Sequence, residues 1–278
     1  HHIFRENERP YLLLTCGHWE HYHMQSDTPD KLSLGKIEEN CLKCPYHGFS
    51  FASDGHCQLA PEFKKPLPGL VVKTFSLKEF SGMIWLYHGN NPVEFKCEKL
   101  SAIHQQFPKS YCQTARQWHS HITYCMENQL DYTHLATVHH NTIGRGFKYP
   151  KNPAFELTEE HITISLDQNK GNALDMIFPN CWILNVGKKM RLVVYFSPIN
   201  NKETLLYLRT YSNMLKLKLI RYLLAPIFNK INLVVLKQDQ RVVESQGSGT
   251  SYLATDDALM RNDMAIKHFR KVWSKNLS

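Results

Sequence analysis

The stretch Glu-Asn-Gln-Leu-Asp-Tyr-Thr-His-Leu-Ala-Thr-Val-His-His, residues 127–140, contains the polar pattern N-x2-D-x2-H-x4-H. Its members are Asn128, Asp131, His134 and His139. On a helix the first three would follow one face at three-residue steps. His139 comes five residues after His134, which an ideal helix turns partly off that face. We expect the helix to loosen or end after Leu135, so that both imidazoles reach one metal ion.

Two histidines and a distant carboxylate form the facial triad that binds Fe(II) and leaves positions open for oxygen. The alternative is an ordinary helix whose histidines are buried and hydrogen-bonded. His140 is an alternative ligand to His139, whereas His119 and His121 lie in a strand pattern and are expected to be half-buried. A single motif of this kind is a hypothesis that the fold must test.

A second group of metal-binding residue types lies nearer the start of the chain. Cys44-Pro-Tyr-His47 has the spacing C-x2-H, and Cys16-Gly-His18 has the spacing C-x-H. Two thiolates on one iron and two imidazoles on the other define a Rieske [2Fe–2S] cluster. A zinc knuckle that uses Cys41 and Cys44 is the competing interpretation, but it leaves the sequence CPYHG and the downstream histidines unexplained.

Composition limits the class of protein. The chain has 278 residues, of which 42% are apolar, enough for two domains with buried cores. Its net charge is +8, but no run of five Lys or Arg occurs, so we expect no nucleic-acid partner. Eight cysteines in a chain of this length favour metal ligation in a reducing compartment, and therefore the cytoplasm. We expect no signal peptide and no membrane-spanning helix.

Hydrophobic patterning divides the chain into an N-terminal all-β domain, residues 1–93, and a C-terminal α+β domain, residues 94–278. The first part begins with a hairpin in residues 3–15, and its prolines at 61, 66 and 68 predict a loop. The second part should contain one antiparallel sheet and covering helices. The strands expected in this region are Trp118 to Tyr124, His161 to Leu166, Ala173 to Phe178, Cys181 to Val186, Arg191 to Phe196 and Thr204 to Tyr211. The helices are Lys99 to Phe107, Met214 to Val243 and Tyr252 to Trp273.

The segment Leu215 to Leu236 is apolar but carries four basic residues, Lys216, Lys218, Arg221 and Lys230. Such a segment can lie on a membrane surface as a basic amphipathic helix. We expect it instead to pack against the sheet of its own domain.

The motifs together resemble those of the Rieske non-haem iron ring-hydroxylating oxygenases, catalytic (α) subunit. The most similar group includes vanillate and dicamba O-demethylases and pheophorbide oxygenase. The resemblance implies a Rieske [2Fe–2S] domain followed by a helix-grip-like domain with a mononuclear Fe(2+). It implies that Cys16, His18, Cys44 and His47 hold the cluster. The interval from His18 to Cys44 is longer than in the family, so His21 and His23 remain alternatives to the first pair.

The resemblance also implies the third iron ligand. Residues 237–246, Lys-Gln-Asp-Gln-Arg-Val-Val-Glu-Ser-Gln, are similar to the family's late D-x4-E-x-Q helix, and Asp239 matches its iron ligand. Glu244 is then a structural partner. Asp131 matches the acid that joins a cluster histidine of one subunit to an iron histidine of its neighbour, which implies a homotrimer. A carboxylate that accepts the free N–H of a metal-bound imidazole fixes the orientation of the ring.

The expected function is that of an oxygenase component. It would use O2 to hydroxylate or oxidatively dealkylate an organic, aromatic or polycyclic, substrate. A separate ferredoxin or flavin reductase would supply electrons, because the chain has no G-x-G-x-x-G nucleotide loop. The alternatives are a non-enzymatic iron–sulfur electron carrier and a zinc-dependent hydrolase. The hydrolase would lack a general base of the H-E-x-x-H type.

Overall fold

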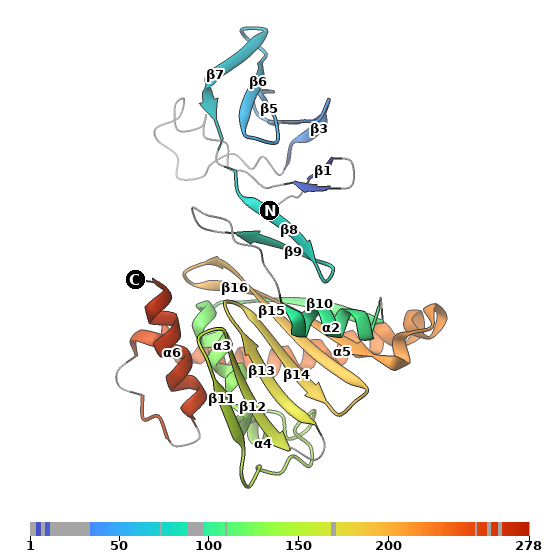
Figure 1. The fold of residues 1–278 in the computed structure, drawn as a ribbon, viewed down its shortest axis with the longest axis vertical. Coiled ribbons are helices and arrows are strands. Elements are labelled where there is room, and N and C mark those ends of the chain that lie inside the picture. Colours follow the sequence, from blue (N-terminus) through green and yellow to red (C-terminus); the bar gives the residue numbers. More distant parts are fainter. Residues whose placement is uncertain are drawn as a thin grey trace. The chain divides into compact units, whose positions relative to one another are not determined.

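The computed structural model describes residues 4–6, 9–11, 34–72, 74–87, 97–108, 110–167, 171–247, 249–254, 257–260 and 263–277. The chain divides into two units, His1–Ser101 and Ala102–Ser278 (Figure 1). The domain boundary predicted between residues 93 and 94 lies outside the described residues and stays a prediction.

Strands and turns form nearly all of the described part of the N-terminal unit, as predicted. The expected hairpin is present as an antiparallel pair, β1 and β2. A five-stranded antiparallel sheet has the order β3-β4-β5-β6-β7, and β8 pairs with β9. The strands are β1 (Phe4–Glu6), β2 (Arg9–Tyr11), β3 (Lys36–Glu38), β4 (Cys41–Lys43), β5 (Ser50–Phe51), β6 (His56–Ala60), β7 (Lys65–Val71), β8 (Ser76–Phe80) and β9 (Met83–Tyr87).

One local prediction in this unit is wrong. Pro66 and Pro68 were expected in a loop, but both lie inside strand β7. β7 is the last strand in the order of its sheet, and an edge strand tolerates residues that cannot donate a backbone hydrogen bond. The prolines therefore mark an edge strand here.

A seven-stranded antiparallel sheet forms the centre of the C-terminal unit, with the order β10-β16-β15-β14-β13-β12-β11. The five predicted strands between His161 and Tyr211 are confirmed as β12 to β16. The strands are β10 (Tyr111–Trp118), β11 (Ala154–Leu157), β12 (His161–Asp167), β13 (Asn172–Ile177), β14 (Cys181–Val186), β15 (Met190–Asn200) and β16 (Glu203–Ser212).

Helices α3, α5 and α6 cover one face of this sheet (Figure 1). Side chains alternate between the two faces of a strand, so Leu174 and Met176 of β13 and Leu206 of β16 all face the helices. They belong to one buried cluster with Met126 and Phe269, which lie on two different helices. The helices are α2 (Glu98–Gln106), α3 (Ile122–Leu130), α4 (Leu135–Val138), α5 (Lys218–Val243) and α6 (Met264–Leu277).

Two predicted elements of the C-terminal unit have different bounds. The strand expected from Trp118 to Tyr124 ends at Trp118, and helix α3 begins at Ile122. His121 causes the change, because its Nδ1 accepts the backbone N–H of Thr123 at 3.3 Å and caps the helix. The helix expected from Tyr252 to Trp273 is present only from Met264, as α6.

The two halves of helix α5 differ in how deeply their side chains are buried. Its buried residues are all in the C-terminal half, between Asn232 and Val243. Leu219 and Leu223 are 72% and 62% exposed, so the prediction that the segment Leu215 to Leu236 packs against its own sheet is wrong for the first turns of the helix and is confirmed from Asn232 onward. The first turns contribute no buried side chain to the core of the unit. In the described part of the chain, α5 is the one helix long and apolar enough to cross a membrane, judged by length and composition alone.

A partly buried ion pair fixes α6 to α3. The guanidinium of Arg270 donates from Nε and NH2 to the two carboxylate oxygens of Glu127, at 2.9 and 2.8 Å. Ser251 also donates to Glu127, at 2.6 Å, and Arg270 donates to the carbonyl of Ala254. Interaction with Glu127 raises the pKa of Arg270 further. This pair anchors the helix that leads into the N-x2-D-x2-H segment.

We expect Arg270→Met to lower the free energy of unfolding by about 3 kcal/mol, because it leaves the Glu127 carboxylate buried without its partner. Urea unfolding followed by tryptophan fluorescence measures the change. The double variant Glu127→Met/Arg270→Met should be less destabilised than the single one. A single variant as stable as the wild type would contradict this role.

Candidate metal centre

The segment that contains the two histidines is a broken helix. Helix α3 ends at Leu130, the 3-10 helix η2 (Tyr132–His134) follows, and α4 begins at Leu135. The break is at Asp131, whose backbone is extended and whose Oδ1 accepts from the N–H and the hydroxyl of Thr133, at 2.8 and 2.5 Å. The predicted break after Leu135 is therefore placed too late. The Asp131 side chain competes with the helix for backbone hydrogen bonds and ends it earlier.

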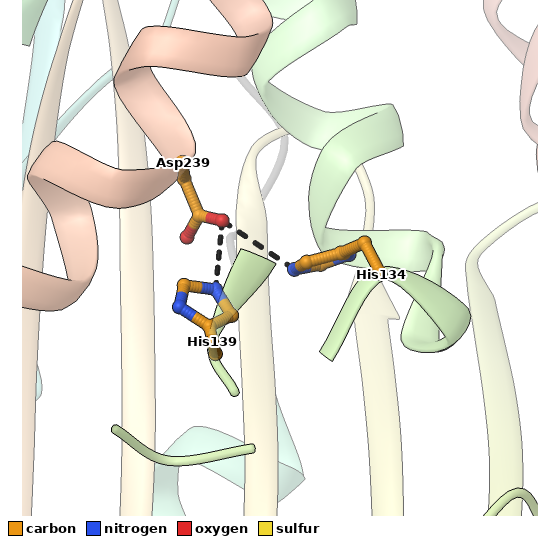
Figure 2. Close-up of side chains that lie close together, drawn as sticks. All are labelled: His134, His139 and Asp239. Atoms are coloured by element: carbon orange, nitrogen blue, oxygen red, sulfur yellow. Dashed lines mark ion pairs between the residues drawn. The ribbon is translucent and has the colours of Figure 1, made fainter. Parts of the chain in front are cut away.

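The structure brings the three predicted iron ligands together (Figure 2). Nε2 of His139 lies 2.8 Å from Oδ1 of Asp239, and Nε2 of His134 lies 3.4 Å from the same oxygen. One ligand atom from each residue lies within 4.8 Å of the others. Asp239 comes from α5, about one hundred residues further along the chain. His139 and Asp239 are buried, and the His134 side chain is 14% exposed.

The orientation of the His139 ring is determined by its other nitrogen. Nδ1 lies 2.9 Å from Oε1 of Gln238, and the hydroxyl of Thr142 donates to the same oxygen at 2.8 Å. Because an amide oxygen only accepts, Nδ1 must carry the proton and donate it. Nε2 is then left unprotonated in the neutral ring, with its lone pair available for a cation.

The turn after His139 closes tightly on the preceding helix. The carbonyl of His139 accepts from the N–H groups of Thr142 and Gly144, at 2.8 and 3.0 Å. A Cβ atom on Gly144 would lie 1.9 Å from the carbonyl oxygen of Leu135. No side chain fits at that distance, so the turn that positions His139 requires glycine at 144.

The electrostatics of the site couple Asp239 to the two histidines. Burial alone would raise the pKa of Asp239, but the adjacent imidazoles outweigh it and hold the pKa below its ordinary value. Burial would lower the pKa of His139, but Asp239 and Gln238 outweigh it and raise the pKa. The carboxylate therefore stays ionised and favours a positive charge between the three side chains.

These residues fit a divalent metal ion. Among the described residues, Oδ1 of Asp239 has no hydrogen-bond partner. The Nε2 atoms of His134 and His139 are close to this oxygen, but neither contact has the geometry of a hydrogen bond. Ligand atoms that share one metal ion, with bonds of about 2.0–2.2 Å, lie at comparable separations. Two imidazoles and one carboxylate are the donor set of non-haem Fe(II) sites.

Glu244 and His140 lie outside the group formed by His134, His139 and Asp239. Glu244 accepts from the backbone N–H of His119 at 2.7 Å and from Nε2 of Gln240 at 2.5 Å, so it joins α5 to the end of β10. That contact agrees with a structural part for Glu244. His140 is exposed, and its Nδ1 contacts the carbonyl of Thr137 at 2.8 Å.

The contacts of Gln238 and Thr142 were not predicted from the sequence. Gln238 directly precedes Asp239, but its distance from His139 depends on how α5 crosses the His-bearing segment.

Asp131 also lies beside His134. Its second oxygen, Oδ2, is 3.9 Å from Nδ1 of His134, which is too long for a hydrogen bond. Nδ1 of His134 is buried and has no hydrogen-bond partner among the described residues. The Asp131 side chain is 32% exposed. Its predicted bridge between subunits stays a prediction.

The C-x2-H motif forms a tight loop between β4 and β5 of the N-terminal unit. The N–H of Cys44 donates to the carbonyl of Phe49 at 2.7 Å, and the N–H of Gly48 donates back to Cys44 at 3.0 Å. Gly48 has a φ of 75°, a conformation that favours glycine. Cys44 is buried, whereas the His47 side chain is exposed.

The other proposed cluster ligands, Cys16 and His18, lie outside the described residues, as do their alternatives His21 and His23. The fit of a cluster therefore depends on Cys44 and His47 here. A buried sulfur and an exposed imidazole on one short loop agree with one thiolate and one imidazole of a Rieske centre.

Comparison with known proteins relates the chain to one group. Residues 12–80 match the family model of the Rieske [2Fe-2S] domain. The chain is 30% identical over 130 residues to the putative toluene-4-sulfonate monooxygenase system iron-sulfur subunit TsaM2 of Comamonas testosteroni, covering 45% of this chain and 36% of that protein. It is 32% identical over 118 residues to methylxanthine N1-demethylase NdmA of Pseudomonas putida, covering 41% of this chain and 33% of that protein. The chain thus matches only about a third of the length of these two relatives.

Solved structures have the same fold. NdmA of Pseudomonas putida CBB5 is matched with a TM-score of 0.73 at 21% identity, over 99% of this chain and 80% of that chain. Dicamba monooxygenase bound to dicamba is matched with a TM-score of 0.72 at 16% identity, over 98% of this chain and 88% of that chain. These comparisons confirm the α+β fold and the resemblance to Rieske oxygenase α subunits.

We expect Gln238→Leu to weaken metal binding by roughly 10–100-fold, because the His139 ring loses the acceptor that sets its protonation and orientation. Titration of the metal-free protein with Fe(II) under anaerobic conditions measures the affinity. Gln105→Leu, an exposed position on α2 outside this site, is the matched control and should bind metal normally. Unchanged affinity in Gln238→Leu would contradict the proposed role.

Proposed function

We propose that this chain, which contains a Rieske [2Fe–2S] domain and resembles Rieske oxygenase α subunits, is the oxygenase component of such a system. It uses O2 and supplied electrons to hydroxylate or oxidatively dealkylate an organic substrate. The observation that carries the proposal is the convergence of His134, His139 and Asp239 in a unit separate from the cluster-binding loop. An electron carrier would need no second metal site with open positions.

The residues divide between two metal groups. Cys16, His18, Cys44 and His47 would hold the [2Fe–2S] cluster, and the three residues of the C-terminal unit would hold one Fe(2+). The bound iron would supply the reductive activation of dioxygen.

The chain's own groups set the conditions of that iron site. Asp239 contributes the negative charge that retains the cation, and Gln238 keeps the proton of His139 on Nδ1. Burial of His139 and Asp239 limits the access of water to this side of the site.

Asp131 is proposed to connect the two metal groups across a subunit boundary. Its Oδ1 is held by Thr133, which leaves Oδ2 on the side of the His134 Nδ1. The carboxylate is partly exposed, so a histidine of a neighbouring chain can reach it. This arrangement supports, as a proposal, a homotrimer in which the cluster of one chain reduces the iron of the next.

The partners follow from the same proposal. Electrons come from a separate ferredoxin or flavin reductase. The substrate is a small organic molecule, aromatic or polycyclic, since the two relatives are named for methylxanthine and toluene-4-sulfonate. The proposed location is the cytoplasm.

A zinc-dependent hydrolase is the remaining alternative that uses the same three residues. Their donor set alone also suits Zn²⁺, which binds imidazole and carboxylate. The Rieske domain in the same chain favours iron, because a hydrolase has no use for a one-electron carrier.

Oxygen consumption tests the proposed activity. With a generic reductase and a panel of aromatic acids, aryl methyl ethers, N-methyl heterocycles and polycyclic compounds, we expect substrate-dependent O2 uptake with formation of a hydroxylated or dealkylated product. Asp239→Ala should abolish product, because the cation loses its only anionic ligand, and should leave the reduced Rieske EPR signal unchanged. Product formation at the wild-type rate in Asp239→Ala would overturn the assignment.

Asp131→Asn separates a bridging role from a structural one. Asparagine keeps an oxygen that can cap η2 but removes the negative charge beside His134. We expect both metal groups to assemble and the onward transfer of electrons from a pre-reduced cluster to fall by orders of magnitude in single-turnover experiments. Glu160→Gln, an exposed acidic position outside this site, is the control. Cluster oxidation at the normal rate in Asp131→Asn would exclude the bridging role.

A further inference from the structure

The N-terminal half of α5 exposes a continuous apolar surface. Leu219, Leu223 and Ile227 follow at four-residue steps and are 72%, 62% and 55% exposed, so they form one stripe along the helix. Ten of the 24 exposed large apolar side chains among the described residues lie within residues 214–234. A folded protein rarely leaves such a concentration of apolar surface in water, and a patch of this kind is typical of a binding surface.

The free part of α5 is too short to cross a membrane. Asn232, Val235 and Asp239 are buried in the C-terminal unit, so the helix cannot leave it from about residue 232 onward. The remaining residues 218–231 span about 21 Å. The hydrocarbon core of a bilayer is about 30 Å thick. An apolar helix of this length can lie in the plane of a membrane surface but cannot span it.

The charged residues in the sequence around the stripe are all basic. Between Glu203 and Asp239 the chain contains six Lys or Arg residues and no Asp or Glu. Lys216 and Lys218, at the start of the helix, are exposed. Two copies of this surface facing each other would bring like charges together, which is unfavourable. An anionic phospholipid surface supplies the opposite charge and an apolar interior.

A groove of about 770 Å³ lies beside the stripe, between α5 and the edge strand β10. Tyr111, Tyr222 and Pro226 line it, with Lys218 at the start of the helix. Tyr222 is 79% exposed. Tyrosine and lysine are the residue types that lie at the level of lipid head groups, because each has an apolar stem and a polar end.

We propose that the N-terminal half of α5 docks in the plane of an anionic phospholipid membrane. Leu219, Leu223 and Ile227 enter the acyl boundary, and Lys216 and Lys218 contact the head-group phosphates. The proposal does not depend on the oxygenase activity, because the metal ligand Asp239 lies on the buried half of the helix.

Co-sedimentation of the full chain with vesicles tests the proposal. We expect binding to vesicles of phosphatidylglycerol and phosphatidylcholine, and weak binding to phosphatidylcholine alone. Leu223→Asp/Ile227→Asp should reduce binding by roughly tenfold or more per residue, from the cost of leaving a large aliphatic side chain unburied. Lys216→Gln/Lys218→Gln should reduce it by about fivefold per lysine. Leu253→Asp and Lys202→Gln, exposed positions elsewhere in the C-terminal unit, are the matched controls.

Three outcomes would overturn the proposal. One is no binding of the wild type to the anionic vesicles. Another is binding that Leu223→Asp/Ile227→Asp leaves unchanged while circular dichroism shows a folded chain. The third is an oligomer, seen by light scattering, that Leu223→Asp/Ile227→Asp dissociates while vesicles remain unbound. That result would identify a second copy of the chain as the partner of the stripe.

Discussion

The carboxylate of Asp239 is buried between two imidazoles, and a lone charge in that position would be costly. Other features of the C-terminal unit reduce this cost. The break at Asp131 ends α3 early enough for His134 and His139 to face the same point. Gln238 and the turn that ends at Gly144 then hold the His139 ring in one orientation. A divalent cation completes the balance of charge, so the local structure is organised for binding one.

The residue types of the site could be predicted from the sequence, but their supporting contacts could not. The spacing alone predicted His134 and His139 as metal ligands, and the resemblance predicted Asp239. The position of the helix break depends on whether the Asp131 side chain or the helix obtains the Thr133 N–H, a competition that periodicity does not report. The contact of Gln238 with His139 requires the crossing of two segments far apart in the chain. The five strands between His161 and Tyr211 were predictable because their alternation is regular.

Helix α5 illustrates a different limit of sequence analysis. Its apolar residues surround the helix, so periodicity could not distinguish the half that packs on the sheet from the half that is exposed. Only the structure separates the half that contains the buried side chains, between Asn232 and Val243, from the stripe formed by Leu219, Leu223 and Ile227. One continuous helix therefore carries the proposed metal ligand Asp239 near one end and an apolar, basic surface at the other. The two halves of the helix lie in two different environments.

Iron and acid-labile sulfide analysis of the purified chain tests the central claim most directly. A Rieske cluster and one mononuclear site together require three irons and two sulfides per chain. Asp239→Ala should lose one iron and keep both sulfides, because its carboxylate lies in the C-terminal unit and the cluster loop in the other. Two irons in the wild type, zinc in place of the third, or an Asp239→Ala variant that retains all three irons would contradict the account.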